Sequence, residues 1–199
     1  DQENVKEICK HLDVTEIEIR DRDSPDVKEY LQKLEFEKVV VPFPSEFLEI
    51  KLLLKKIYDS KVEELKKRDL LFGPANKFSL LKLQSKLGAR YANAKDFNAM
   101  IGMSLTATAI KLSHALELLE TQTLSGVNEY FNSLIEQANQ KKSKAVQSLV
   151  KSPEFNAAKI AVQNLLTKKI EHPKIEEAAA IVENQLKEKE NSKIIISVS

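Results

Sequence analysis

The sequence predicts a mainly α-helical protein: a multi-helix domain with short α/β segments at both ends. From residue 46 to residue 189, apolar residues recur at the three- and four-residue spacing of helices. With only four Gly and six Pro among 199 residues, loops should be few. Strand-like patterns occur only near the two ends of the chain.

The N-terminal part of the chain alternates between helical and strand patterns. Ser24 and Pro25 form a good helix start, because Ser caps helices and Pro is tolerated in the first turn. The predicted order is a helix, a strand with alternating apolar residues, a second helix and a valine-rich strand that two prolines end, over residues 4–12, 15–20, 25–34 and 36–43. This pattern is typical of the edge of an α/β domain.

Helical spacing replaces this alternation after residue 45. Gly73 and Pro74 interrupt the first long helix, and Pro153 and Pro173 each suit the first turn of a later one. The predicted helices cover residues 46–71, 79–91, 95–122, 124–140, 143–150, 153–169 and 173–189. The chain then closes with an apolar run, 193–198, which resembles a strand from inside a parallel sheet. We therefore expect this chain to be part of a larger protein.

The helix over 95–122 should lie at the centre of the bundle, because it carries two apolar stripes and few charges. One stripe holds Phe97, Met100, Ile101, Leu105, Ala109, Leu112, Leu116 and Leu119, and the other holds Met103, Ala107, Ile110, His114 and Leu118. His114 is interpreted as a packed core histidine in preference to a ligand, since no metal-binding residue accompanies it. Cys9 shares an apolar face with Val5, Ile8 and Leu12 and is predicted to be a buried free thiol.

Several kinds of chemistry have no sequence signal in this chain. It lacks a phosphate-binding glycine loop, a clustered Asp-Glu motif and any catalytic Ser, His and Asp arrangement, so no catalytic residue is predicted. Its three histidines are far apart, so no metal site is predicted either. No apolar run reaches the roughly 20 residues of a membrane span. The N-terminus does not resemble a secretion signal, and a lone cysteine suits the reducing cytoplasm.

Charge is strongly segregated along the chain, although the net charge is only +1. Residues 51–95 contain twelve Lys or Arg and four Asp or Glu, whereas residues 1–50 contain seven and fourteen. This pattern favours an anionic partner for the basic block. The candidate nucleic-acid-binding residues are Lys66, Lys67, Arg68, Lys77, Lys82, Lys86, Arg90 and Lys95. A solvated helix surface is the alternative, and charge alone leaves both interpretations open.

One segment carries a family resemblance. Residues 111–122, Lys-Leu-Ser-His-Ala-Leu-Glu-Leu-Leu-Glu-Thr-Gln, closely resemble a hallmark of the helical, thumb-like insertion in archaeal Hef and its relative FANCM, which are superfamily 2 DEAH-box DNA helicases. Supporting matches to the same family follow in order at 24–30, 172–174 and 191–196. Residues 197–199 depart from the family's continuation of the last segment.

The resemblance implies three regions: the C-terminal edge of a first RecA-like motor domain (1–44), the helical insertion (45–171) and the start of a second motor domain (172–199). It implies that the parent protein is an ATP-dependent helicase that uses ATP and Mg²⁺. The motifs for ATP would lie outside this chain, which has no Walker or DEAH motif and no cofactor of its own. The implied location is the cytoplasm of an archaeal cell, near the nucleoid.

The first functional hypothesis is that the insertion binds the backbone of branched or double-stranded DNA during repair and fork processing. The second hypothesis is an intramolecular coupling or protein-docking module that contacts the flanking motor domains without binding DNA itself. A third is an RNA-helicase insertion of the RIG-I-like type, which grips double-stranded RNA. No membrane partner is expected.

Overall fold

The computed structural model describes residues 2–21, 23–28, 30, 36–141, 143–170 and 172–197. The chain divides into two compact units, Asp1–Val40 and Val41–Ser199, and each is treated by itself. No helix of the described residues is long and apolar enough to cross a membrane.

The first unit contains α1 (Gln2–His11) and the single turn α2 (Pro25–Lys28). The rest of the helix predicted over 25–34 falls almost entirely on residues outside those described. Between α1 and α2 the chain turns at Asp21, whose carboxylate accepts hydrogen bonds from the Asp23 amide at 3.0 Å and the Ser24 hydroxyl at 2.9 Å. The prediction of a buried Cys9 is wrong, because its side chain is half-buried and its neighbours Val5 and Ile8 are more than half exposed.

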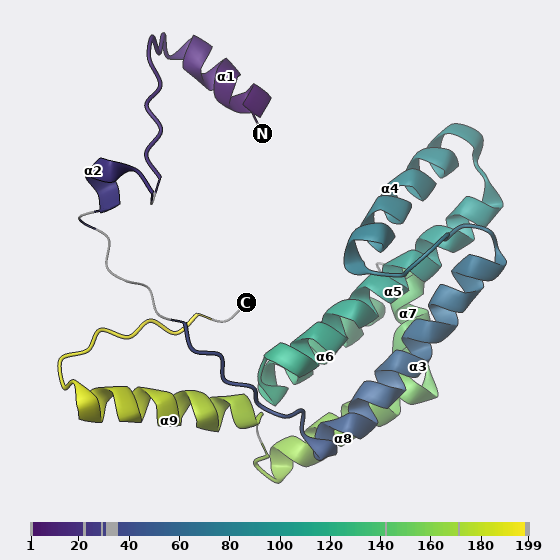
Figure 1. The fold of residues 1–199 in the computed structure, drawn as a ribbon. Helices are drawn as coiled ribbons and strands as arrows, with labels where there is room; N and C mark the ends of the chain where they lie inside the picture. The colour runs from purple at the N-terminus through teal and green to yellow at the C-terminus, as the bar shows by residue number, and fades with distance from the viewer. Residues whose placement is uncertain are drawn as a thin grey trace. The chain divides into compact units, whose positions relative to one another are not determined.

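The second unit is a helical bundle, as the sequence predicts (Figure 1). Each predicted helix is present, and most boundaries move by only a few residues. The helices are α3 (Ser45–Lys67), α4 (Lys77–Ala94), α5 (Phe97–Thr121), α6 (Leu124–Asn139), α7 (Lys144–Val150), α8 (Pro153–Thr167) and α9 (Pro173–Glu188). The mainly α fold class is therefore confirmed.

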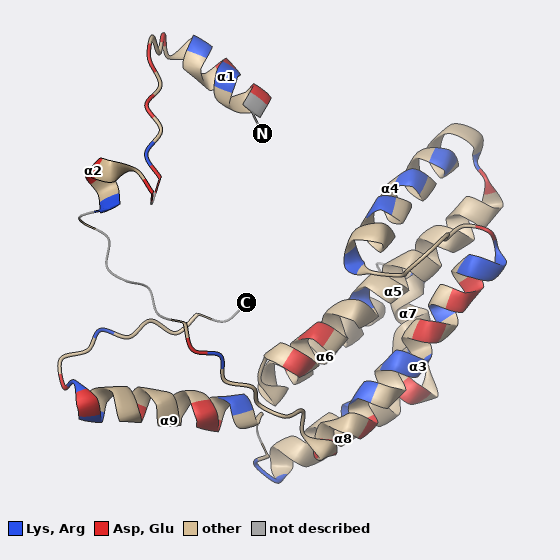
Figure 2. Ribbon diagram, viewed as in Figure 1, with Lys and Arg blue, Asp and Glu red and all other residues tan. Residues whose placement is uncertain are grey.

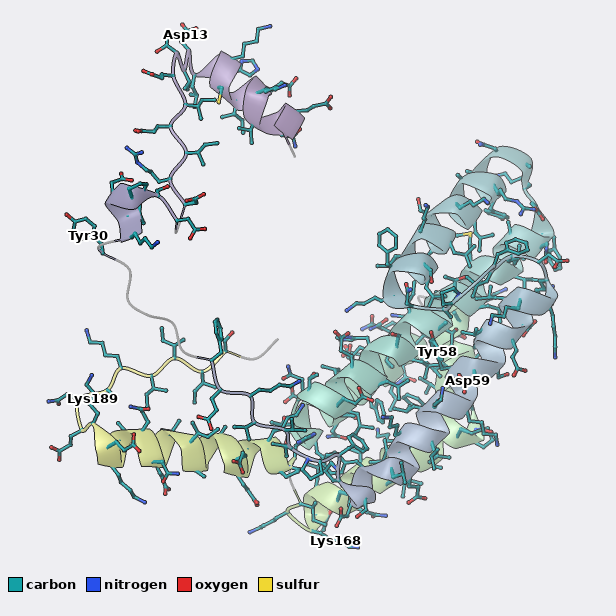
Figure 3. The ribbon with its side chains drawn as sticks, viewed as in Figure 1. Asp13, Tyr30, Tyr58, Asp59, Lys168 and Lys189 are labelled. Carbon is teal, nitrogen blue, oxygen red and sulfur yellow. The ribbon has the colours of Figure 1, made fainter. Side chains whose placement is uncertain are left out.

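Two clusters of buried apolar residues fill the bundle, and α3 and α5 contribute to both. We call them the basal and the distal cluster. The basal cluster joins one half of α3 and α5 to α6, α7 and α8 through residues that include Phe47, Leu119, Phe131 and Phe155. The distal cluster joins the other half to α4 through Leu65, Leu83, Leu87 and Ala99, among others. Tyr58, near the middle of α3, packs against both clusters (Figure 3).

The helix directions follow from polar contacts near the helix ends. Lys51 pairs with Glu120 at 2.7 Å, and Arg68 donates to Asn98 at 3.3 Å, so α3 and α5 are antiparallel. Lys77 pairs with Glu117 at 2.8 Å, near the other end of α5 from the loop that joins it to α4. Helix α4 is thus also antiparallel to α5. The distal cluster lies between these three helices.

Helix α5 is central, but its buried face is not the predicted one near its start. Phe97 is 68% exposed and Met100 is 40% exposed, whereas Ala99 and Gly102 are buried. Small residues replace large ones here because α4 and the loop after α3 approach α5 closely. A side-chain carbon at Gly102 would lie 2.5 Å from Leu70 Cδ1 and 2.9 Å from Leu87 Cδ1. The predicted stripe is right further along, where Leu112 and Leu119 are buried.

The predicted strands are not formed by the residues that the structure describes. Residues 14–21, 36–44 and 192–197 carry no helix or strand, and the valine and isoleucine side chains of these segments are mostly exposed. A strand needs a neighbouring strand to satisfy its backbone N–H and C=O groups. The described residues provide no such neighbour, so the local preference of these segments for strand is not enough to form a sheet.

The prediction that His114 is a core histidine is wrong, and the buried histidine of the bundle is His172. His114 is not a core residue: its side chain is 44% exposed, lies 4.8 Å from the Tyr130 ring centre and is 3.6 Å from Glu117. His172, by contrast, is 2% exposed and begins α9. Its Nδ1 accepts the Lys174 N–H at 3.2 Å, which leaves the proton of the neutral ring on Nε2. Its ring packs edge-on against Phe47 in the basal cluster, with centroids 5.6 Å apart.

We expect Gly102→Val to destabilise the chain by about 1–3 kcal/mol, because the added carbons overpack the contact with Leu70 and Leu87. Gly88→Ala on α4 is the matched control, since nothing lies within 4 Å of the position of its added carbon. It should stabilise the chain by about 0.5–1 kcal/mol through helix propensity. Urea unfolding measures both effects. A stable Gly102→Val variant would contradict the close approach.

We also expect folding stability to fall as the pH drops below about 6.5. Burial, with a smaller effect of the Lys174 ammonium, lowers the pKa of the His172 imidazole from its ordinary 6.5. The unfolded chain therefore binds a proton at this position before the folded chain does, and stability is lost as the pH falls toward the folded-state pKa. His172→Asn keeps a capping side chain but does not titrate. Its melting temperature should depend less on pH between 7 and 5 than that of the wild-type chain.

Candidate nucleic-acid interface

Helix α4 is a basic helix whose N-terminus is capped. Asn76 caps it in a reciprocal arrangement: its side chain accepts the Ser79 N–H at 2.8 Å, and the Ser79 hydroxyl accepts the Asn76 N–H at 2.9 Å. Leu80, Leu83 and Leu87 face the distal cluster and are buried. The helix contains no Asp or Glu. Figure 2 accordingly shows only Lys and Arg bands along it.

Three of the predicted residues lie at four-residue spacing on α4, and we call them the α4 basic face: Lys82, Lys86 and Arg90. All three are exposed. Lys82 and Lys86 have no ion-pair partner among the described residues. Ser85 and Ala89 are exposed between them on the same side, and small side chains leave room for a polymer backbone to approach the helix.

Arg90 differs from its two neighbours because it is already engaged. Its guanidinium pairs with Asp96, which also caps α5 by accepting the Asn98 amide at 2.8 Å and the Ala99 amide at 3.2 Å. The Ala99 amide most of all, and then Arg90, hold the pKa of the Asp96 carboxyl below its usual value. Arg90 therefore closes the α4–α5 turn, and a phosphate would have to compete with Asp96 for it.

Arg68 and Lys77 are likewise bound to partners within the bundle. Arg68 donates two hydrogen bonds to Glu64 at 3.0 and 3.1 Å, and it also reaches Asn98. The bond from Lys77 to Glu117 is the main cause of the lowered pKa of the Glu117 carboxyl. Both residues join α5 to its neighbours, so they support the bundle and are less available to a ligand.

The remaining predicted residues lie at helix ends. Lys66 and Lys67 occupy the last turn of α3, where cations complement the negative end of the helix. Both are exposed and without an ion-pair partner in the part of the chain that is described. Lys95 ends α4 in the left-handed region, with its ammonium 5.3 Å from the Tyr91 ring centre. The structure thus groups Lys82, Lys86 and Arg90 but leaves the other five apart from that face.

Sequence reasoning missed which charges are paired. Lys77 and Glu117 are 40 residues apart, and no local pattern links them. The Arg90–Asp96 pair spans a turn whose geometry depends on the left-handed Lys95. Two apolar side chains of α4 are also exposed, Leu81 by 49% and Phe78 by 76%. Both lie beside Lys82 and add apolar surface to this side of α4.

The described residues contain no group of three or more His, Cys, Asp or Glu side chains placed to hold a metal ion. What the arrangement offers is a helix without acids on which Lys82 and Lys86 are exposed and have no ion-pair partner among the described residues. Such a surface suits a polyanion.

Comparison with known proteins identifies this bundle as a helicase-associated helical domain. The chain belongs to the family described as "Putative ATP-dependent RNA helicase, helical bundle", which matches residues 46–172. The structure is similar to the crystal structure of the Pyrococcus furiosus Hef helicase domain, with a TM-score of 0.71 and 28% sequence identity over 97% of this chain. The resemblance to the Hef and FANCM group is thereby confirmed.

Two relatives that are similar in sequence are also helicases by name. The chain is 29% identical over 198 residues to the "Putative ATP-dependent RNA helicase MJ1505" of Methanocaldococcus jannaschii. It is 25% identical over 186 residues to the ATP-dependent DNA helicase mph1 of Sclerotinia sclerotiorum. It spans 24% and 15% of these two proteins and 41% of the Hef chain. The assignment of residues 1–44 and 172–199 to flanking motor domains stays a prediction.

We expect Asp96→Ala to lower the melting temperature, because it removes both the cap of α5 and the partner of Arg90. Asp96→Asn keeps an oxygen for the amides of Asn98 and Ala99 but removes the charge. Its melting temperature should therefore lie between those of Asp96→Ala and the wild type. The lowered carboxyl pKa adds a pH test. The advantage of the wild type over Asp96→Asn should be present at neutral pH and vanish as acid protonates Asp96. A difference that does not depend on pH would contradict the ion pair.

Proposed function

We propose that this bundle binds the phosphate backbone of double-stranded DNA as the insertion of an ATP-dependent helicase, and that it helps to recognise branched DNA during repair and fork processing. The single observation that supports this proposal is the α4 basic face, where Lys82 and Lys86 are exposed and unpaired among the described residues on a helix without acids. The proposal also draws on the helicase names of the relatives.

Contacts of this kind read charge and shape, not base sequence. Lysine ammonium groups meet phosphate oxygens, and each phosphate that is neutralised releases counterions into solution. The expected binding is therefore independent of sequence and weakens steeply with salt. Selectivity for a fork would come from the angle between two duplex arms and not from base contacts.

The motor chemistry belongs elsewhere in this proposal. ATP and Mg²⁺ would be bound by flanking RecA-like domains of the DEAH-box type, because this chain has no glycine loop to cradle phosphates. The bundle would hold the nucleic acid while those domains move along it. Its contribution is a rigid grip, for which α4 is held at both ends by Lys77–Glu117 and Arg90–Asp96.

A second candidate function is mechanical coupling of the two motor domains. Contacts between the bundle and α9 favour it: the Lys174 ammonium donates to the Glu120 carbonyl at 2.7 Å, and His172 packs on Phe47. These contacts join the end of α5 to the start of α9. In this case the lysines of α4 would be solvated, and the chain would not bind DNA by itself.

Replacing Lys82 and Lys86 by Gln separates the two candidates. We expect the double variant to weaken binding to a three-way fork, and to reduce the slope of log K against log salt by about 2, since two phosphate contacts are lost. Fluorescence anisotropy with labelled fork and linear duplex of equal length measures both quantities. Fork selectivity should appear as tighter binding to the fork than to the duplex at each salt concentration.

The matched control is Lys55→Gln with Lys56→Gln on α3. It removes the same charge, but these lysines are paired with Asp59 at 3.1 Å and Glu154 at 3.0 Å. Its binding should stay close to wild type. Equal losses in the two double variants would show a net-charge effect with no particular face. If the wild-type chain binds neither nucleic acid at moderate salt, coupling becomes the better account.

The same titration with matched RNA duplex addresses the third hypothesis. The family description and one relative carry the words RNA helicase, whereas another carries DNA helicase. Backbone contacts to phosphate alone would bind both duplexes with similar salt slopes. A clear preference for RNA would point to contacts with the 2′-hydroxyl groups and would replace DNA as the proposed ligand.

A further inference from the structure

We infer a second phosphate-binding site, on a different surface of the bundle, in a notch between α3, α5 and α7. The notch is a cavity of about 170 Å³ whose polar lining comes from Lys61, Ser104, Thr108, Ser148 and Ser152. None of these residues belongs to the predicted interface. The inference rests on the proposed function, because it takes the phosphate to be part of a nucleic-acid backbone.

Apolar residues of both clusters form the rest of the notch wall. Ile57 and Leu149 are buried members of the basal cluster, and Leu105 is buried in the distal cluster. The notch therefore lies where the two clusters meet along α5. These packed apolar side chains form the wall, whereas the hydroxyl groups of Ser104 and Ser148 are exposed at the notch.

The hydrogen bonds of the four hydroxyl groups show which are available. Thr108 donates to the Ser104 carbonyl at 3.0 Å, and Ser152 donates to the Leu149 carbonyl at 2.7 Å, so both protons are already used. The hydroxyl groups of Ser104 and Ser148 have no hydrogen-bond partner within the described residues. Two donors in the notch can thus turn toward an incoming oxygen.

The charge of the notch has one sign. Lys61 lines it and makes no ion pair with any residue that the structure describes. An adjoining surface hollow shares Ser148 and Ser152 with it and adds Lys144 and Lys151. No Asp or Glu lines either one. Glu154, two residues after Ser152, is held by Lys56 at 3.0 Å.

This combination selects a tetrahedral oxyanion over other small ligands. A phosphate offers several acceptor oxygens, and the notch offers one ammonium and two hydroxyl groups that can donate to them. A cation would meet Lys61 without a carboxylate to hold it. The two further lysines on the rim favour a chain of phosphates, because a backbone places successive charges along a line that single ions cannot supply.

The test uses single and double variants of the full 199-residue chain. Lys61→Gln should reduce the salt slope of duplex binding by about 1, and Lys61→Gln with Lys151→Gln by about 2. Ser148→Ala should weaken binding without changing the slope. Lys61→Arg, which keeps the charge, should restore most of the affinity. Lys55→Gln is the control on the same helix and should behave as wild type, since Lys55 is paired with Asp59.

A titration with inorganic phosphate, followed by amide NMR, tests the notch without any duplex. The amide signals of Ser104 and Ser148 should move in the wild type and stay fixed in Lys61→Gln. If no signal near the notch moves, the inference is wrong, whether or not the chain binds DNA. If phosphate binds but Lys61→Gln keeps the wild-type salt slope, the notch takes a free oxyanion and not a backbone, and the inference is also wrong.

The two proposals fail in different ways. A wild-type salt slope in Lys61→Gln together with a reduced slope in the Lys82 and Lys86 variant would contradict phosphate binding at the notch and support binding at the α4 basic face. A reduced slope in Lys61→Gln together with a wild-type slope in the Lys82 and Lys86 variant would contradict binding at the α4 basic face and support the notch.

Discussion

The burial of α5 along its length is the constraint on which the rest of the structure depends. One half of this helix completes the distal cluster with α3 and α4, and the other half completes the basal cluster with α3, α6, α7 and α8. A helix that is covered on several sides cannot carry many charges, so the basic residues have to lie on its neighbours. Gly102 and Ala99 permit the tight approach of α4, and this approach fixes the direction in which Lys82 and Lys86 point.

The same packing sorts the charged residues into two groups. Residues that lie between helices are engaged across them: Lys51, Lys77 and Arg90 form ion pairs, and Arg68 donates a hydrogen bond to Asn98. Each contact holds one end of a helix against α5. Exposed pairs of this kind contribute little stability individually, so orientation is their main effect. Residues that point outward keep their charge available to a ligand. The proposed functions concern only this second group, which the structure distinguishes and the charge count does not.

The sequence is informative where the spacing of apolar residues decides the structure, and less so where contacts between distant residues do. Helices α6 and α8 were predictable because Phe131, Phe155 and their neighbours form regular apolar stripes. The end of α3 was not predictable, because Asp69 adopts the left-handed conformation in which glycine is the usual residue. The Asp69 N–H donates to the Lys66 carbonyl at 3.0 Å and closes the turn. The basic face of α4 could be predicted from four-residue spacing, whereas the pairing of Arg90 with Asp96, and that of Lys77 with Glu117, could not. Nor could the notch, whose lining residues come from three helices and from the residue that caps α8.

The central claim is that α5 makes the basal and distal clusters one cooperative unit, so that the α4 basic face is rigidly held. Native-state hydrogen exchange in increasing urea tests this most directly. We expect the amides of α5 from Gly102 to Leu119, together with those of Leu83 and Leu87 on α4, to exchange through one common opening with the global free energy of unfolding. If α4 and the first half of α5 instead opened at clearly lower free energy while the basal cluster stayed protected, the two clusters would be separate units and the account would be wrong.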